Sequence, residues 1–264
     1  MKDLIYYADL AKSILEDEKK YFHDKKIIKK IFELTSKNYD IHAIISRLTI
    51  IDSYYSTQMN KRYFGIEDIA NKIWELYGNN EKKVETAFIE FAESPSNEII
   101  LSLFNDNYGI KKDGEEYGKA ISLISKYAYF QTNFKFPIYD NLARKVLPKI
   151  FKLYFTNVKI TMKSIENIKN YINAINIFKS NSRINDYNKI DNLLWLTGKI
   201  REGNLSLILK KDEYIDFVNT LKSKKIFEKE EINKDDKSSF VLKWSDLLKD
   251  EKIIEFCEFV RNIK

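Results

Sequence analysis

The chain has 264 residues, of which 44% are hydrophobic and 14% aromatic, and its net charge is +6. This composition excludes an intrinsically disordered chain, and no uninterrupted apolar run reaches the length of about 18 residues that a membrane span needs. One cysteine and two histidines exclude an intramolecular disulfide and cannot form a protein zinc or iron–sulfur site, so we expect no metal and a location in the reducing cytoplasm.

Apolar residues recur at the spacing of amphipathic helices along the first half of the chain. We expect helices over residues 4–15, 27–34, 41–55, 66–76, 84–92 and 99–104. Ser96 is placed to cap the last of these. Three of the seven glycines follow, at Gly109, Gly114 and Gly118. This concentration predicts a tight hairpin that ends where the next helix begins.

The second half of the chain is predicted to be helical as well. The helix that begins near Gly118 continues through Ala128, and Pro137 interrupts the segment after it. Asp140 is placed to start another helix that ends near Leu147, and Pro148 separates it from later stretches. Those stretches are 150–155, 165–178, 190–200 and a final helix over 244–263. Strand signals are thin, so we predict an all-α fold.

Basic residues concentrate between residues 141 and 190. Ten lysines and arginines stand there against two acids, so this segment carries +8, more than the surplus of the whole chain. Such a concentration is typical of proteins that bind a polyanion. A lysine-rich, solvated surface explains the same excess, so charge alone leaves nucleic-acid binding open.

Two lysines and one carboxylate form a candidate site near the hairpin. Lys119 and Lys126 are seven residues apart, which places them on one face of a helix with Ser122 between them. A helix that opens after glycine-rich backbone also directs free N–H groups toward a phosphate. Asp140 follows shortly afterwards, in a position where a carboxylate ordinarily only caps a helix.

The order of these features resembles the helix-hairpin-helix DNA glycosylases, and most of all the bacterial proteins that are similar to 8-oxoguanine DNA glycosylase. The resemblance spans roughly residues 40–200. It rests on the runs from Ile50 to Met59, Ser125 to Tyr127, Phe136 to Asp140 and Asp191 to Trp195. It implies a two-lobed helical core over residues 1–204 with a cleft between the lobes, followed by a C-terminal helical appendage over 205–264.

The resemblance implies an enzyme that flips a modified base out of double-stranded DNA and cleaves its N-glycosidic bond. Asp140 would stabilise the positive charge of the transition state. Lys126 or Lys119 would supply an amine if the enzyme also acts as a lyase, and without such an amine the reaction would stop at an abasic site. Both outcomes remain open. The candidate substrates are oxidised guanine, in DNA repair, and hypermodified phage bases, in anti-phage defence.

The resemblance also assigns residues around the reacting centre. The candidates for the base pocket are Gln58, Tyr54, Tyr55, Tyr139 and Trp195. The candidates for DNA-backbone contacts are Gly109, Gly114, Gly118, Lys61, Arg62, Arg144 and Lys145. The tyrosines and the tryptophan also suit an apolar core, which is the commoner use of aromatic residues at helical spacing. No cofactor is expected, although the resemblance leaves open a monovalent cation at the hairpin.

Two other classes of function fit the same sequence. The first is a non-catalytic DNA-binding protein on the same scaffold, and the second is a helical interaction module whose lysines keep it soluble. For the glycosylase we expect a monomer without membrane contact, whose partner is double-stranded DNA carrying a modified base.

Overall fold

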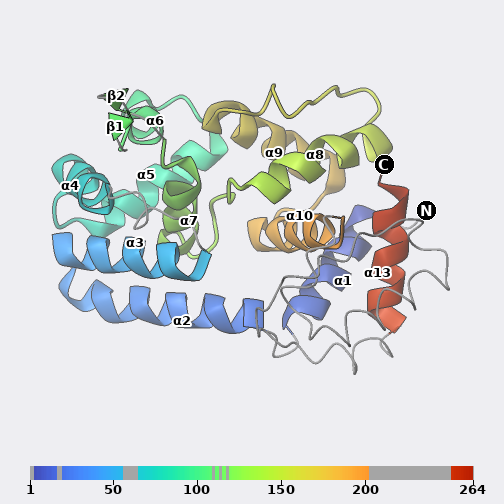
Figure 1. The fold of residues 1–264 in the computed structure, drawn as a ribbon, viewed down its shortest axis with the longest axis horizontal. Coiled ribbons are helices and arrows are strands. Elements are labelled where there is room, and N and C mark those ends of the chain that lie inside the picture. The colour runs from blue at the N-terminus through green and yellow to red at the C-terminus, as the bar shows by residue number, and fades with distance from the viewer. Residues whose placement is uncertain are drawn as a thin grey trace.

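The computed structural model describes residues 3–16, 20–55, 65–108, 111–112, 115–116, 119–201 and 251–263. Apart from one short hairpin, the regular structure of these residues is helical, so the predicted all-α fold is confirmed (Figure 1). In the part of the chain that is described, no helix is both long enough and apolar enough to cross a membrane.

The described residues of the first part of the chain form six α-helices and one 3-10 turn. Their bounds are α1 Leu4–Glu16, α2 Lys20–Thr35, η1 Ser36–Asn38, α3 Ile41–Tyr55, α4 Ile66–Tyr77, α5 Glu81–Glu93 and α6 Glu98–Asn105. The cap of α6 is Asn97, whose side chain accepts the amides of Ile99 and Ile100. The prediction that Ser96 is the cap was therefore wrong by one residue, because both side chains are good caps and only the backbone at 97 is placed to serve.

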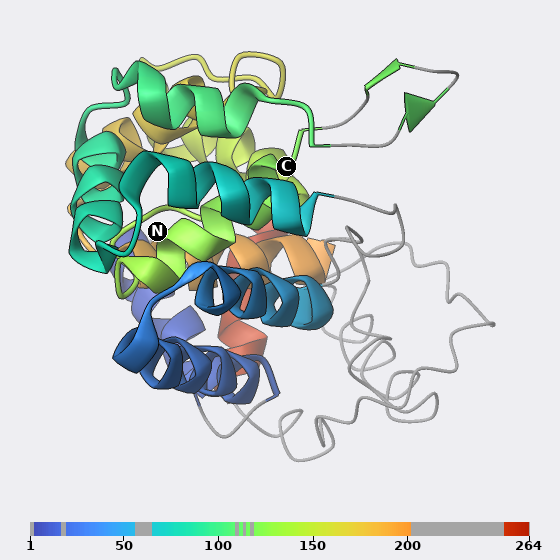
Figure 2. The ribbon, with the colours of Figure 1, turned by 90° about the vertical axis from the view of Figure 1, so that its left-hand side faces the viewer.

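A β-hairpin connects α6 to the next helix. Its strands are β1 (Lys111–Lys112) and β2 (Glu115–Glu116), which pair in antiparallel register, and Asn107 pairs with Lys119 nearer the helices. Figure 2 shows β1 and β2 standing away from the helical body. The three glycines that predicted the hairpin lie outside the described residues.

The second part of the chain contains five described helices. Their bounds are α7 Ile121–Gln131, α8 Asn141–Tyr154, α9 Ile168–Ser182, α10 Tyr187–Arg201 and α13 Glu251–Asn262. Helix α8 continues through Pro148, so the predicted division at that residue was wrong. Proline inside a helix costs about 3 kcal/mol. Buried residues on both sides of it, Leu147 and Ile150 among them, pack α8 against the core and offset this cost.

The helices share one contiguous hydrophobic core. Helices α2 to α7 occupy one half of the view in Figure 1, and α1, α8, α9, α10 and α13 occupy the other. Helix α7 is buried along nearly its whole length, from Leu123 to Gln131. The late helix α13 packs on α1, where Phe259 stacks on Tyr7 with 4.1 Å between ring centroids. The described C-terminal residues therefore belong to the same core.

Helices α8 and α10 approach each other closely at a glycine. A Cβ atom on Gly198 of α10 would lie 2.8 Å from the Cβ of Leu142 in the first turn of α8. Real side chains do not tolerate such a distance, so the packing of these two helices requires glycine at this position.

Candidate active site

Lys126 is a buried lysine on α7. Its side chain is 5% exposed. The Nζ atom donates a hydrogen bond of 2.7 Å to the Ser122 hydroxyl, one turn earlier, and lies 5.2 Å from the centroid of the Tyr55 ring on α3. No carboxylate among the described residues is within ion-pair distance of it. The ammonium form of Lys126 therefore lacks a direct counter-ion there.

The surroundings of Lys126 favour the neutral amine. Burial lowers the pKa of Lys126, and the carboxylates of Asp140, Asp191 and Asp52 raise it only in part. Desolvation disfavours the charged form of any lysine, and here it outweighs attraction to the three acids. The amine therefore loses its proton at a lower pH than an exposed lysine does.

Asp140 is the N-cap of α8 and also acts on Lys126. Its Oδ1 atom accepts the amide of Ala143 at 2.7 Å. Burial raises the pKa of the Asp140 carboxyl, whereas Lys126 and the amides of Ala143 and Leu142 oppose this rise. The cap bond leaves other acceptor sites of the carboxylate open, because a carboxylate has more than one.

The segment before Asp140 is fixed by its aromatic residues. Phe136 is fully buried and packs edge-on against Phe88 and face to face with Phe104. The hydroxyl of Tyr171 on α9 donates to the carbonyl of Ile138 at 2.7 Å. These contacts hold the Phe-Pro-Ile-Tyr segment in the core, and they thereby position the carboxylate that follows it.

A second lysine–carboxylate pair lies in the same region, and sequence reasoning missed it. Lys25 of α2 donates to Asp191 of α10 at 2.9 Å, and both side chains are less than a tenth exposed. The Lys25 amine also contacts the Tyr129 hydroxyl, the Asn188 Oδ1 and the Asn192 Oδ1, at 3.0 to 3.2 Å. The sequence did point to Asp191, because this residue begins the Asp-x-x-Leu-Trp run on which the resemblance rests. Lys25 belongs to no such motif, so its role could not be predicted.

The structure separates the two candidate lysines. Helix α7 begins at Ile121, so Lys119 precedes it and does not share a helix face with Lys126, contrary to the prediction. Lys119 is exposed at the base of the hairpin, where it pairs with Asn107. The predicted hairpin is present as β1 and β2, and α7 begins at Ile121, slightly later than predicted. Lys126 is the lysine that lies beside Asp140.

The predicted base-pocket aromatics take different positions. Tyr55 lies beneath Lys126, and its buried hydroxyl has no hydrogen-bond partner among the described residues. Tyr54 is 37% exposed. Tyr139 is buried, and its hydroxyl donates to the carbonyl of Glu166. Trp195 is partly buried on α10, with the Lys199 amine 5.5 Å from its ring centroid. Gln58 lies outside the described residues.

Of the predicted DNA-backbone residues, only two fall within the description. Arg144 lies on α8 with its guanidinium 5.2 Å from the Tyr139 ring centroid, and its buried Nε has no partner among the described residues. Lys145 follows it and is partly buried. The remaining candidates are undescribed: Lys61, Arg62, Gly109, Gly114 and Gly118.

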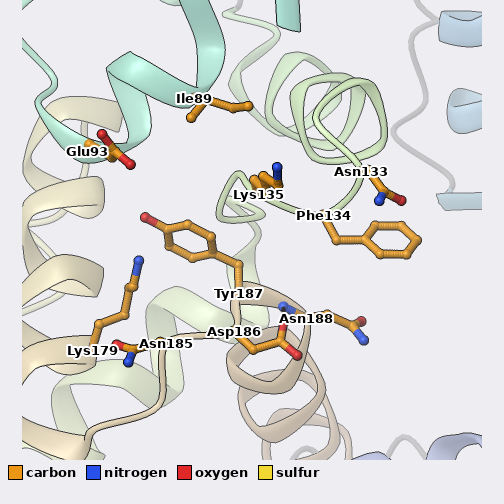
Figure 3. Close-up of a pocket in the computed structure, with 10 residues that line it drawn as sticks. All are labelled: Ile89, Glu93, Asn133, Phe134, Lys135, Lys179, Asn185, Asp186, Tyr187 and Asn188. Atoms are coloured by element: carbon orange, nitrogen blue, oxygen red, sulfur yellow. Dashed lines mark hydrogen bonds between the residues drawn. The ribbon is translucent and has the colours of Figure 1, made fainter. Parts of the chain in front are cut away.

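A separate cavity of about 420 Å³ opens between α5, α9 and α10 (Figure 3). It is lined by Ile89, Glu93, Asn133, Phe134, Lys135, Lys179, Asn185, Asp186, Tyr187 and Asn188. Its charges are of both signs, and the Lys179 amine already lies 4.0 Å from the Tyr187 ring centroid. None of Lys126, Asp140 and Tyr55 lines it, so it is distinct from the lysine–carboxylate site.

No protein-family model, curated protein or solved structure matches this chain. Among the described residues, no group of three or more His, Cys, Asp or Glu side chains is arranged to hold a metal ion. The chemistry of the site is therefore argued from its own residues.

Proposed function

We propose that this protein is a DNA glycosylase that excises a flipped, modified base, with Lys126 as the nucleophilic amine and Asp140 as the carboxylate beside the deoxyribose. The observation that carries the proposal is the buried Lys126 amine, held by a hydroxyl and an aromatic ring and influenced by Asp140. A lowered pKa increases the share of a lysine that is neutral and nucleophilic at a given pH, and desolvation is a common way to lower it.

The reaction would proceed by displacement at the sugar. The neutral Lys126 amine attacks C1′ of the flipped nucleotide and forms a C–N bond, while the N-glycosidic bond breaks and the base leaves with its electron pair and takes up a proton. Opening of the sugar ring then converts the adduct to a protonated imine. This species can lose the 3′ phosphate by β-elimination, so the same lysine supports a lyase step.

Asp140 would act through its charge. The transition state of N-glycosidic cleavage resembles an oxocarbenium ion, and a fixed carboxylate in a desolvated site stabilises that positive charge. The amides of the first turn of α8 hold the carboxylate in place. Tyr55 would complete the site as a surface on which the flipped base stacks.

Basic residues near this site provide electrostatic support for a DNA partner. Burial lowers the pKa of Lys149 on α8, and the neighbouring cations Arg201 and Lys152 lower it further. Cations that repel one another in this way are relieved by a bound polyanion. Lys149 and Lys152, together with Arg144 and Lys145, give a basic character to α8, the helix that Asp140 starts.

Covalent trapping tests the proposal. Duplex oligonucleotides carrying 8-oxoguanine or a hypermodified pyrimidine are incubated with the protein and borohydride, which reduces the imine to a stable cross-link. We expect a cross-link with the wild type and with Lys119→Gln, and none with Lys126→Gln. Asp140→Asn retains a helix cap and removes the charge, so its rate of base release should fall by a factor on the order of 100.

Other outcomes would favour the rival functions. Salt-dependent DNA binding without base release on any substrate would indicate a non-catalytic DNA-binding protein. Failure to bind DNA at low salt would instead indicate a helical interaction module. A survey by mass spectrometry of the bases released from oxidised DNA and from modified phage genomes would identify the substrate.

A further inference from the structure

The Lys25–Asp191 pair lies against the same face of α7 as the candidate amine. Ser122, Lys126 and Tyr129 are spaced by four and then three residues, so they follow one another along one face of the helix. Ser122 binds the Lys126 amine, and the Tyr129 hydroxyl contacts the Lys25 amine. The two buried lysines are therefore neighbours along this face, one from α7 and the other from α2.

Asp191 forms an ion pair with Lys25 only, but its charge influences both lysines. Its Oδ2 lies 2.9 Å from the Lys25 amine, whereas it makes no ion pair with Lys126. Its charge still acts on both Lys126 and Asp140. The ion pair with Lys25 thus weakens the attraction between the Asp191 carboxylate and the ammonium form of Lys126.

We infer that Lys25 is a positioning residue, which holds Asp191 in its own ion pair and so prevents Asp191 from becoming the counter-ion of Lys126. The mechanistic role of this residue rests on the proposed function, but the protonation of Lys126 does not, because it can be measured without DNA. Asn188, Asn192 and Tyr129 contribute by surrounding the Lys25 amine.

Charged and titratable groups surround Lys126 from three neighbouring elements. Helix α3 contributes Asp52 and Tyr55, the start of α8 contributes Asp140, and α10 contributes Asp191. Of these carboxylates, Asp191 is the one that forms an ion pair with Lys25. A substitution at Lys25 therefore acts on Lys126 mainly through the charge of Asp191.

Breaking the pair from its two sides should have opposite effects on Lys126. In Lys25→Met, Asp191 loses the ion pair with Lys25, and its charge favours the ammonium form of Lys126 more strongly. In Asp191→Asn, two buried cations remain with one acid fewer, which favours the neutral amine. The double variant Lys25→Met/Asp191→Asn removes both charges and should lie close to the wild type. A purely structural role for the pair would give the two single variants effects of the same sign.

The measurement is the pH dependence of labelling at Lys126 in the full chain without DNA. Formaldehyde and cyanoborohydride methylate neutral amines, and mass spectrometry of the peptide that contains Lys126 reports its rate. At pH 7 we expect labelling in Lys25→Met to be slower by a factor on the order of 10, and labelling in Asp191→Asn to be faster than in the wild type. Lys25→Arg, which keeps the charge, should behave like the wild type.

Controls keep the inference testable if one variant folds poorly. Glu81→Gln disrupts another ion pair, the one that Glu81 forms with the buried Arg47. Glu81 is not among the charges that act on Lys126, so labelling at Lys126 should not change. Circular dichroism verifies the fold of each variant. If Lys25→Met does not fold, the faster labelling expected of Asp191→Asn still decides the sign.

The results separate this inference from the proposed function. Equal labelling in all variants, or shifts of the same sign in both single variants, would overturn the role of Lys25. Opposite shifts without any DNA adduct would support the role of Lys25 while contradicting the glycosylase. Adduct formation with unchanged labelling would support the glycosylase while contradicting the role of Lys25.

Discussion

The hydroxyl of Ser125 accepts the backbone amide of Tyr139 at 3.0 Å and donates to the carbonyl of Ser122 at 3.0 Å. Ser125 precedes Lys126, and Tyr139 precedes Asp140. One buried side chain therefore joins the peptide before the candidate amine to the peptide before the candidate carboxylate. The relative position of Lys126 and Asp140 is set by the backbone rather than by an ion pair between them.

Replacement of Ser125 by alanine should affect both stability and activity. The variant leaves the Tyr139 amide buried without its partner, which costs about 1–3 kcal/mol. Because Asp140 follows directly, the rate of base release should fall more than the stability loss explains at temperatures where the protein is folded. Urea unfolding and single-turnover kinetics measure the two effects. Ser180→Ala is a matched control, since the exposed Ser180 bonds to the carbonyl of Asn176 within α9, and it should leave the kinetics unchanged.

The reaction should depend on pH through both members of the site. Burial lowers the pKa of Lys126 and raises that of Asp140. The reaction needs a neutral amine and an ionised carboxylate, so protonation of either group on acidification slows it. On the alkaline side the rate of borohydride trapping should become constant below pH 10.5, the ordinary pKa of lysine. On the acid side it should decline at a pH above 3.8, the ordinary pKa of aspartate.

The profile has two clear alternatives. A rate that continues to rise up to pH 10.5 would show that Lys126 behaves as an exposed lysine and is not the activated amine. In Asp140→Asn the acid limb should change shape, because only the amine then titrates. An unchanged acid limb would exclude Asp140 from the rate-limiting step.

The packing of α13 can be tested through the buried thiol of Cys257. Burial, with a smaller effect of Glu258, raises the pKa of this thiol to about 12. A thiol reagent at pH 8 should therefore react only on unfolding, because the thiolate is the reactive form. Phe259→Ala removes the ring stacked on Tyr7 and should cost about 3 kcal/mol and speed the reaction. Asn262→Ala, at an exposed position of α13, should do neither.

Immediate reaction of Cys257 in the native protein would contradict this packing. The experiment also reports whether α13 unfolds with the rest of the protein. Coincidence of thiol exposure with the loss of helical circular dichroism in urea would show one cooperative unit. Earlier exposure would show that α13 separates first.

Arg47 should be important for stability and irrelevant to the reaction. Its guanidinium is fully buried and bonds to Glu81 at 2.6 Å, Gln131 at 2.8 Å and the carbonyl of Phe32 at 2.9 Å. Arg47→Met should destabilise the protein by about 3 kcal/mol, near the lower end for buried pairs because Glu81 is 25% exposed. Urea unfolding measures this loss, and the exposed Lys82→Met should cost less than about 1 kcal/mol. An equal effect of the two variants would contradict the role of Arg47.

Sequence reasoning predicted what depends on local patterns. The fold class, most helices and the position of Asp140 before a helix follow from apolar periodicity and from cap chemistry, both of which act over a few residues. The division at Pro148 was wrong because tertiary packing overrides the local cost of proline. Spacing alone placed Lys119 and Lys126 on one face, but the hairpin extends to residue 119 and delays the helix to Ile121.

The rest of the site depends on contacts between distant segments. Lys25 and Asp191 are separated by 166 residues in the chain. No periodicity or motif links such positions, and a lysine on an amphipathic helix ordinarily faces solvent. The burial of Lys126 was also hidden from the sequence, because it depends on how α3 and other helices pack against α7. The glycosylase chemistry itself stays a prediction.

Gly198 has a further consequence for the two carboxylates near Lys126. Asp140 belongs to the start of α8 and Asp191 to α10, and these helices touch where Gly198 faces Leu142. A single added methyl group at Gly198 would force them apart by several tenths of an ångström while leaving every ionisable side chain intact. Substitution of this one glycine by alanine would thus change the spacing of the charges without changing their number. The variant would show whether the reactivity of Lys126 depends on the distance to the two carboxylates or only on their presence.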